Sequence, residues 1–209
     1  MTVQIVPSVI MKHAPKITKT VSESRPALKG AFHDTDGSIT VTNSRYLWRV
    51  ENAHAYPEPI VIDPITMARI EQTYPPNTKS LFPDPENATA VWEISLDKYT
   101  LGLLKSVKEA GRYRDDRTLE KKDKVLFRIT GNTLSLYKSA ADLQLKHFGF
   151  NNPDAKVLIN AAYLLNTLEW MADELGERAT VNMYYYEPIR PLLIEQGRVK
   201  AIIMPVREN

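Results

Sequence analysis

Basic side chains recur at helical spacing in one segment of the sequence. A helix predicted over 97–110 places four of them within one arc: Lys98, Lys105, Lys108 and, just beyond the helix, Arg112. Apolar residues occupy its opposite side: Leu96, Leu103, Val107 and Ala110. Such a positive face can attract the phosphates of a nucleic acid without contacting its bases. An ordinary solvated helix also carries lysines opposite an apolar stripe, so both interpretations stay open.

A second group of lysines lies near the start of the sequence and comprises Lys12, Lys16 and Lys19. They fall opposite an apolar helical face: Ile10, Ala14, Ile17 and Val21. A proline inside a helix costs about 3 kcal/mol, so this helix is kinked at Pro15 or begins there. A third predicted helix, over 160–175, has an acidic polar side: Glu169, Asp173, Glu174 and Glu177. These carboxylates would repel phosphate, so not every helix can face a nucleic acid.

The run Ala201-Ile-Ile-Met-Pro-Val-Arg207 ends in residues that suit an apolar ligand. Methionine adapts its shape to irregular ligands, and an arginine can fix the direction in which a ligand lies. Taken alone, such an apolar run is more often a buried strand. Pro205 ends the hydrogen-bond ladder, however, so the residues around it are expected at a sheet edge that a ligand can reach.

Other arrangements of reactive side chains give weaker signals. The sequence has no cysteine and four scattered histidines, so no thiolate nucleophile, metal site or other cofactor is expected. His33 beside Asp34 and Asp36 belongs to a predicted exposed turn without a nearby nucleophile. Tyr184 and Tyr186 could share one face of a strand and stack on bases, but core packing is more usual. No motif supports an enzyme.

Length and composition indicate a soluble globular protein. The 209 residues suffice for one large domain or two small ones, and 43% are hydrophobic and 25% charged. No apolar run approaches the roughly 20 residues that span a bilayer, and the first residues do not resemble a secretion signal. We therefore expect a cytoplasmic protein without membrane association. The formal net charge of +2 is too small to indicate nucleic-acid binding by itself.

The elements that would position these residues fall into two halves. In the first, β-branched and aromatic residues between turn residues predict strands at 3–5, 27–32, 38–41, 46–50 and 60–62. Asp63 and Pro64 are typical of a helix start and predict a helix through about Thr73. Four prolines between Tyr74 and Asn87 then indicate an irregular connector.

The second half repeats this pattern more completely. Strands are predicted at 91–94, 124–130, 133–137, 143–148, 156–159, 179–186, 191–195 and 199–205. Helices over 97–110 and 160–175 interrupt them, which indicates an α+β fold with two helices on one face of antiparallel sheet. We expect a first, incomplete domain over 1–81, a linker at 82–90 and a complete domain over 91–209.

Several motifs, in this order along the chain, resemble those of the bacterial DNA sliding clamp, the β subunit of DNA polymerase III. Thr42-Asn-Ser-Arg-Tyr-Leu47 is similar to a Thr-Asp-Gly-His-Arg-Leu segment of the clamp's central domain, although its four middle residues differ. Leu81-Phe-Pro-Asp84 resembles the link to the clamp's last domain. Phe148-Gly-Phe-Asn and Asn160-Ala-Ala-Tyr-Leu-Leu resemble segments of that last domain. Ile202-Ile-Met-Pro-Val-Arg207 resembles its final Val-Val-Met-Pro-Met-Arg run.

The resemblance implies a DNA-clamp fold with two clamp-like domains and no catalysis. It implies a replication processivity factor whose basic helices contact double-stranded DNA non-specifically. It also implies a pocket for peptides of DNA polymerases and clamp loaders, formed by Thr42, Leu47, Pro83, Ile202, Met204, Pro205, Val206 and Arg207. Because a clamp ring has six such domains, three copies of this chain would form the homo-oligomeric ring.

A departure from the family leaves a second function open. The family has several more strands between the positions of Thr73 and Phe82, so the first domain is expected to be truncated. The family closes its ring by pairing edge strands, and lost strands would remove such an edge. A non-encircling clamp mimic or adaptor that binds replication peptides without DNA is therefore the alternative. A compact, divergent clamp relative of this kind fits a phage or prophage origin.

Overall fold

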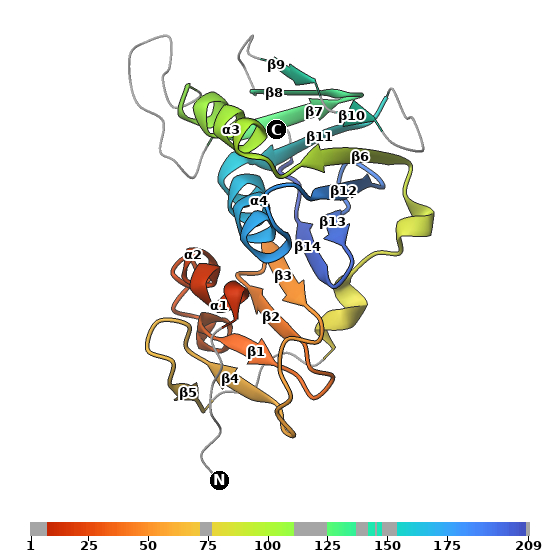
Figure 1. Cartoon of the computed structure of the whole chain (residues 1–209). Coiled ribbons are helices and arrows are strands. Elements are labelled where there is room, and N and C mark those ends of the chain that lie inside the picture. Colours follow the sequence, from red (N-terminus) through yellow and green to blue (C-terminus); the bar gives the residue numbers. More distant parts are fainter. Residues whose placement is uncertain are drawn as a thin grey trace. The chain divides into compact units, whose positions relative to one another are not determined.

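Antiparallel strands and a few helices make up the computed structural model, which describes residues 8–71, 77–110, 125–136, 142–144, 146–147 and 154–207 (Figure 1). The predicted strand at 3–5 and the predicted basic residue Arg112 lie outside these residues. The chain divides into two units. The first comprises residues 1–82 and 197–201, and the second comprises 83–196 and 202–209.

The first unit begins with two short helices, α1 (Val9–His13) and α2 (Pro15–Thr18). Pro15 is the first residue of α2, where its missing N–H leaves no hydrogen bond unmade. The helix predicted around Pro15 is therefore divided into two, and the second helix begins at this proline. The side chains of Ile10 and Ile17 are fully buried, which confirms the predicted apolar face.

The sheet of the first unit has five described strands, paired antiparallel in the order β3-β2-β1-β4-β5. They are β1 (Ala31–His33), β2 (Ile39–Thr42), β3 (Tyr46–Val50), β4 (Ile60–Ile62) and β5 (Arg69–Ile70). Every residue of β3 is buried, so this strand lies in the core. Segment 197–201 belongs to this unit because the N–H of Glu51 donates to the carbonyl of Arg198 at 2.9 Å.

The segment after β4 forms a hairpin, so the helix predicted through Thr73 is wrong. Asp63 Oδ1 accepts hydrogen bonds from the N–H groups of Ile65 and Thr66 at 2.7 and 3.3 Å. The N–H of Asp63 also donates to the carbonyl of Ala68 at 2.9 Å, which closes the turn. An aspartate before a proline suits a turn as well as a helix start. Here the backbone pairing of β5 with β4 decides between them.

Three short 3-10 helices accompany these strands: η1 (Pro26–Lys29), η2 (Thr78–Leu81) and η3 (Pro85–Asn87). The strand predicted at 27–32 is therefore wrong for its first residues, since only Ala31 onward pairs as a strand. Pro26 at the first position of η1 fixes its own φ in the helical range. The side chains of Asn77 and Asp84 cap η2 and η3 by accepting backbone hydrogen bonds.

In the second unit, four strands pair antiparallel in the order β10-β6-β12-β13. They are β6 (Ala90–Ser95), β10 (Lys146–His147), β12 (Thr180–Tyr185) and β13 (Leu192–Gln196). The pairing of β6 with β12 extends over six residues, from Ala90 opposite Tyr185 to Ser95 opposite Thr180. The N–H of Leu96 continues it by donating to the carbonyl of Ala179 at 2.9 Å.

A second sheet of this unit has the order β11-β7-β8-β9. Its strands are β7 (Leu126–Thr130), β8 (Thr133–Leu136), β9 (Asp142–Gln144) and β11 (Lys156–Asn160). Trp92 Nε1 donates to the carbonyl of Gly131 at 2.8 Å and thereby ties β6 to the β7–β8 turn. β14 (Val199–Ile203) is shared between the two units and ends two residues before the predicted boundary at Pro205.

Two longer helices lie side by side in the second unit (Figure 1): α3 (Lys98–Ala110) and α4 (Ala161–Leu175). The buried residues of α4 include the predicted Leu164, Leu165, Leu168 and Met171. The buried face of α3 comprises Leu101, Leu104 and Val107. The predicted apolar face of α3 is therefore wrong at Leu103, which is half-buried, and at Ala110, which is exposed, and it omitted Leu101 and Leu104. No helix within the described ranges is long and apolar enough to cross a membrane.

We expect Asn160→Ala to lower the free energy of unfolding of the second unit by about 1 kcal/mol. Asn160 Oδ1 accepts from the N–H groups of Ala162 and Tyr163 at 2.9 and 3.2 Å, and alanine would leave both donors without this acceptor. Urea denaturation followed by far-ultraviolet circular dichroism measures the change. Asn160→Asp keeps an acceptor and is the control, and an equal loss in both variants would contradict the capping role.

Candidate functional site

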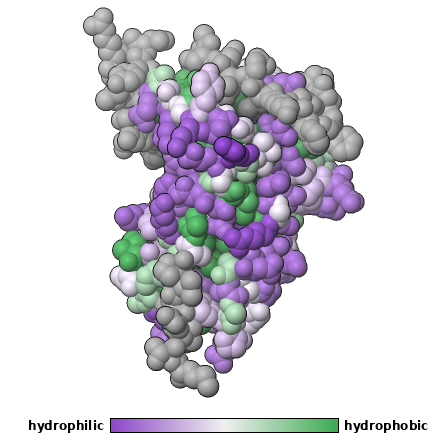
Figure 2. Space-filling view, viewed as in Figure 1, coloured by the Kyte–Doolittle hydropathy of each residue, from purple (hydrophilic) through white to green (hydrophobic). Residues whose placement is uncertain are grey.

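Two lysines of α3 form ion pairs with carboxylates on or just after α4. Lys105 Nζ lies 2.8 Å from Glu169 Oε1, and Lys98 Nζ lies 3.1 Å from Glu177 Oε1. The side chains of Lys98 and Lys105 are 83% and 53% exposed, so both ammonium groups stay in contact with solvent. The surface over α3, in the upper part of Figure 2, is mainly hydrophilic. Two lysines of the predicted basic stripe are thus paired with two of the predicted acidic residues.

The pairing of β6 with β12 explains which residues meet. α3 follows β6 and α4 precedes β12, so the two helices run antiparallel to each other. Ser95 lies opposite Thr180. Lys98 lies three residues after Ser95, and Glu177 lies three residues before Thr180, so their side chains meet. Both helices rise about 1.5 Å per residue, so the next pair along them, Lys105 with Glu169, follows two turns later.

Lys108 lies apart from these two lysines. Its side chain is only 16% exposed, and its Nζ lies 3.8 Å from Glu109 Oε1. In a helix of 3.6 residues per turn, Lys108 falls beside the buried Leu101 and Leu104. The prediction of one exposed basic arc is therefore wrong for Lys108, because this residue lies at the border of the buried face of α3.

The lysines of the first unit lie on and after its two short helices. Lys12 and Lys19 are exposed, and Lys16 is half-buried. The carbonyl of Lys16 accepts a hydrogen bond from the Tyr46 hydroxyl at 3.2 Å, which ties α2 to β3. A contact of these lysines with DNA stays a prediction.

The tail segment, defined as residues 204–207, follows the buried end of β14 as chain without regular secondary structure. The N–H of Val206 donates to the carbonyl of Leu158 at 2.7 Å, so this segment runs beside β11. Met204 and Val206 are 40% and 36% exposed, and Arg207 is exposed as well. Ile202, by contrast, is buried. The run is therefore a buried strand up to Ile203 and an accessible apolar segment after it.

The other predicted pocket positions differ in accessibility. Thr42 is half-buried, and its Oγ1 donates to the carbonyl of Tyr46 at 2.8 Å. Leu47 is buried, and Pro83 is half-buried. Thr42 and Leu47 belong to the first unit, whereas Pro83 and the tail segment belong to the second. A common pocket of these residues stays a prediction.

The turn between β2 and β3 contains the residues that differ from the clamp motif. Asn43 Oδ1 accepts from the N–H groups of Arg45 and Tyr46 at 3.0 and 3.1 Å, and Asn43 Nδ2 donates to Thr20 Oγ1 at 2.7 Å. Ser44 has a φ of 73°. These residues form a turn whose shape is held by the side chain of Asn43.

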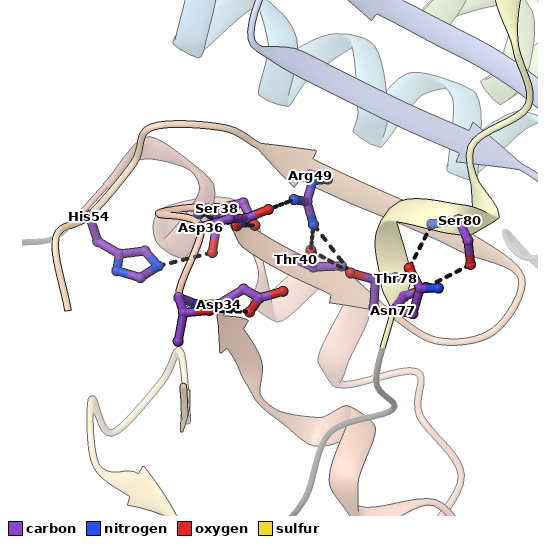
Figure 3. A network of polar contacts seen from close by, with 10 residues as sticks. Asp34, Asp36, Ser38, Thr40, Arg49, His54, Asn77, Thr78 and Ser80 are labelled. Carbon is purple, nitrogen blue, oxygen red and sulfur yellow. Dashed lines mark hydrogen bonds and ion pairs between the residues drawn. The ribbon is translucent and has the colours of Figure 1, made fainter. Parts of the chain in front are cut away.

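A buried arginine, which the sequence analysis missed, organises polar contacts in the first unit (Figure 3). The side chain of Arg49 is 1% exposed, and its Nη1 donates to Thr40 Oγ1 and Thr78 Oγ1 at 3.4 and 3.3 Å. Its Nη2 pairs with Asp36 Oδ2 at 2.5 Å. Burial raises the pKa of Asp36, but the hydrogen bonds from Ser38 and the charge of Arg49 outweigh burial and lower the pKa.

This network joins the β2–β3 hairpin to η2. The signal for it in the sequence is an arginine inside the otherwise apolar strand Tyr46-Leu-Trp-Arg-Val50. A buried charge requires a partner, so such a position predicts a polar network even where the partners cannot be named. Thr78 is a partner from a segment 29 residues away, and only the fold brings it near.

His33 lies in β1 and is only 2% exposed, so its predicted position in an exposed turn is wrong. Its ring centroid lies 5.1 Å from that of His54 and 5.5 Å from that of Tyr56. Burial, and then the nearby His54, lower the pKa of His33 to about 4. The imidazole is therefore neutral at neutral pH and serves packing. Within the described ranges, no cluster of three potential metal ligands occurs.

We expect acid to weaken the first unit through His33. The unfolded chain binds a proton at His33 below about pH 6.5 and the folded chain only below about pH 4, so this stabilisation is complete above pH 6.5 and falls between these values. The loss at pH 5 is about 2 kcal/mol. Hydrogen exchange of β1–β3 peptides at pH 5 and 7.5, corrected for intrinsic rates, measures it. An unchanged pH dependence in His33→Phe would contradict this assignment.

The tyrosine run at the end of β12 is mostly buried. Tyr185 and Tyr186 are each 4% exposed, and Tyr184 is half-buried. Burial raises the pKa of Tyr186, so this phenol stays protonated. The packing role that the sequence favoured for this run over base stacking agrees with this burial.

Solved structures similar to this chain are bacterial sliding clamps. The β subunit of Streptococcus pyogenes DNA polymerase matches with a TM-score of 0.69 and 14% identity, over 100% of this chain and 68% of its own. The β subunit of Borrelia burgdorferi DNA polymerase III, in complex with a natural product, matches with a TM-score of 0.68 and 14% identity, over 96% of this chain and 61% of its own. The Helicobacter pylori β clamp bound to a DNA ligase peptide matches with a TM-score of 0.64 and 14% identity, over 95% of this chain and 62% of its own.

The chain therefore has the fold of a DNA sliding clamp. More narrowly, this is the fold of the β subunit of bacterial DNA polymerase III, which confirms the predicted clamp fold. The chain spans about three fifths to two thirds of the length of these structures, from 61% to 68%. No family model and no curated protein matches the sequence.

Proposed function

We propose that this protein is a sliding-clamp-like processivity factor of DNA replication. It contacts double-stranded DNA non-specifically and docks peptides of DNA polymerases and clamp loaders. The observation that carries this proposal is the clamp fold, which extends over 96% to 100% of the chain in the structures of Borrelia burgdorferi and Streptococcus pyogenes. The protein acts in the cytoplasm and catalyses no reaction itself.

The tail segment supports the peptide-docking part of this function. Its backbone is held to β11 through the bond from Val206 to Leu158, while Met204 and Val206 keep more than a third of their surface exposed. A fixed backbone with accessible apolar side chains reduces the entropy lost when a ligand binds. Arg207 beside them can pair with a polar or acidic group of the peptide.

We expect the double variant Met204→Ala, Val206→Ala to weaken peptide binding about tenfold, because it removes apolar contacts at the centre of the proposed site. The probe is a fluorescein-labelled copy of the DNA ligase peptide seen on the Helicobacter pylori clamp, measured by fluorescence anisotropy. Ile189→Ala, at a 64% exposed apolar residue outside the tail segment, is the matched control. Equal affinity of the double variant and the wild type would reject the tail segment as the docking site.

A clamp holds DNA topologically, so the proposed function also implies an assembly that surrounds the duplex, in addition to the direct contact with phosphate. Three chains of two clamp-like domains would supply six domains. We expect sedimentation equilibrium at rising protein concentration to show a species of three 23.8 kDa chains. A single-chain mass at every concentration would contradict the ring. It would not affect the peptide site, which the anisotropy measurement tests separately.

A second function, that of a non-encircling adaptor or clamp mimic, is favoured by the charges on α3. Lys98 and Lys105, which would face phosphate, already pair with Glu177 and Glu169. Such a protein would bind replication peptides through the tail segment without DNA. The single-chain mass described above, together with intact peptide binding, is the result expected for the adaptor.

A further inference from the structure

The two ion pairs between α3 and α4 bear directly on how strongly the protein could hold DNA. Lys105 reaches toward Glu169, whose side chain is only 21% exposed and therefore anchored against the unit. Lys98 pairs with Glu177, which is 57% exposed, at the other end of the helix pair. Tyr99, 80% exposed, lies between these ends on the outer side of α3. Lys98 and Lys105 thus each have a carboxylate oxygen within 3.1 Å.

A lysine strengthens DNA binding by neutralising a phosphate and releasing a counterion. The released counterions are cations condensed on the DNA. A lysine paired with a carboxylate must break that pair to reach a phosphate, and the carboxylate left beside the DNA repels phosphate. Exposed ion pairs are weak and open readily, so the carboxylates do not block such a contact. They reduce its gain in free energy and its dependence on salt.

We infer that Glu169 and Glu177 limit the affinity of the α3 surface for the DNA backbone. This inference rests on the DNA contact of the proposed function and adds two carboxylates that set its strength. A contact weakened in this way suits a protein that must move along a duplex, because each step breaks and remakes the same phosphate contacts. The β6–β12 register places both carboxylates, so this property belongs to the fold and not to a mobile loop.

The experiment compares Glu169→Gln, Glu177→Gln with the wild type. Glutamine keeps the shape of each side chain and removes its charge. Fluorescence anisotropy with a short fluorescein-labelled DNA duplex, over about 50 to 200 mM salt, gives the affinity and its salt slope. We expect the double variant to bind about two- to thirtyfold more tightly at the lowest salt. Its salt slope should be steeper by up to about two, one for each released lysine.

A matched control separates local pairing from net charge. Glu58→Gln, Glu86→Gln makes the same change in net charge at two exposed carboxylates on other segments. Lys98→Glu, Lys105→Glu removes the cations themselves and should abolish the gain when combined with the glutamine changes. Glu177→Gln alone, at the more exposed carboxylate, should give part of the gain in DNA affinity. This single variant tests the inference even if the change at Glu169 impairs folding.

Three results would overturn the inference. One is an unchanged affinity of the glutamine variant while the wild type binds measurably, which leaves the proposed DNA contact intact. Another is an equal gain in the control at Glu58 and Glu86, which would assign the effect to net charge. A third is the absence of binding in every protein, including the glutamine variant at the lowest salt, which would reject the DNA contact itself and favour the adaptor.

Discussion

The antiparallel pairing of β6 with β12 is the constraint on which the second unit depends. Six residues of each strand are paired, and the pairing continues through the bond from Leu96 to Ala179. One strand leads into α3 and the other follows α4, so a single register sets the strands and both helices. A shift by one residue would turn every side chain of a strand to the other face, and the buried Trp92 and Met183 make such a shift costly.

This register also decides the electrostatics of the surface. A basic stripe and an acidic stripe on two separate helices describe two surfaces of opposite sign, but antiparallel packing brings them together as Lys98 with Glu177 and Lys105 with Glu169. The apolar side chains of the tail segment remain accessible meanwhile. The structure therefore combines exposed apolar side chains in the tail segment with paired lysines on α3, and the proposed experiments decide what each surface binds.

The first unit shows a different use of buried polar groups. Arg49 lies in the interior and contacts Asp36, Thr40 and Thr78, so its removal would leave Asp36 Oδ2 without this cation. His33 takes the other course, since burial keeps it neutral. Contacts with polar partners stabilise the buried Arg49, whereas His33 is tolerated in the interior because it is neutral. Both tie a sheet of short strands to the segments that flank it.

The sequence by itself determined the helices α3 and α4 and most strands, because apolar periodicity and turn residues act over a few residues. The clamp fold was predicted from the motifs that resemble those of the sliding clamp. The sequence also located the end of the buried strand before Pro205. Only the tertiary structure decided that Asp63 begins a hairpin, that His33 is buried, and which carboxylates meet the lysines of α3. These outcomes depend on partners far apart in the chain, and a local pattern carries no information on which distant residues will pair.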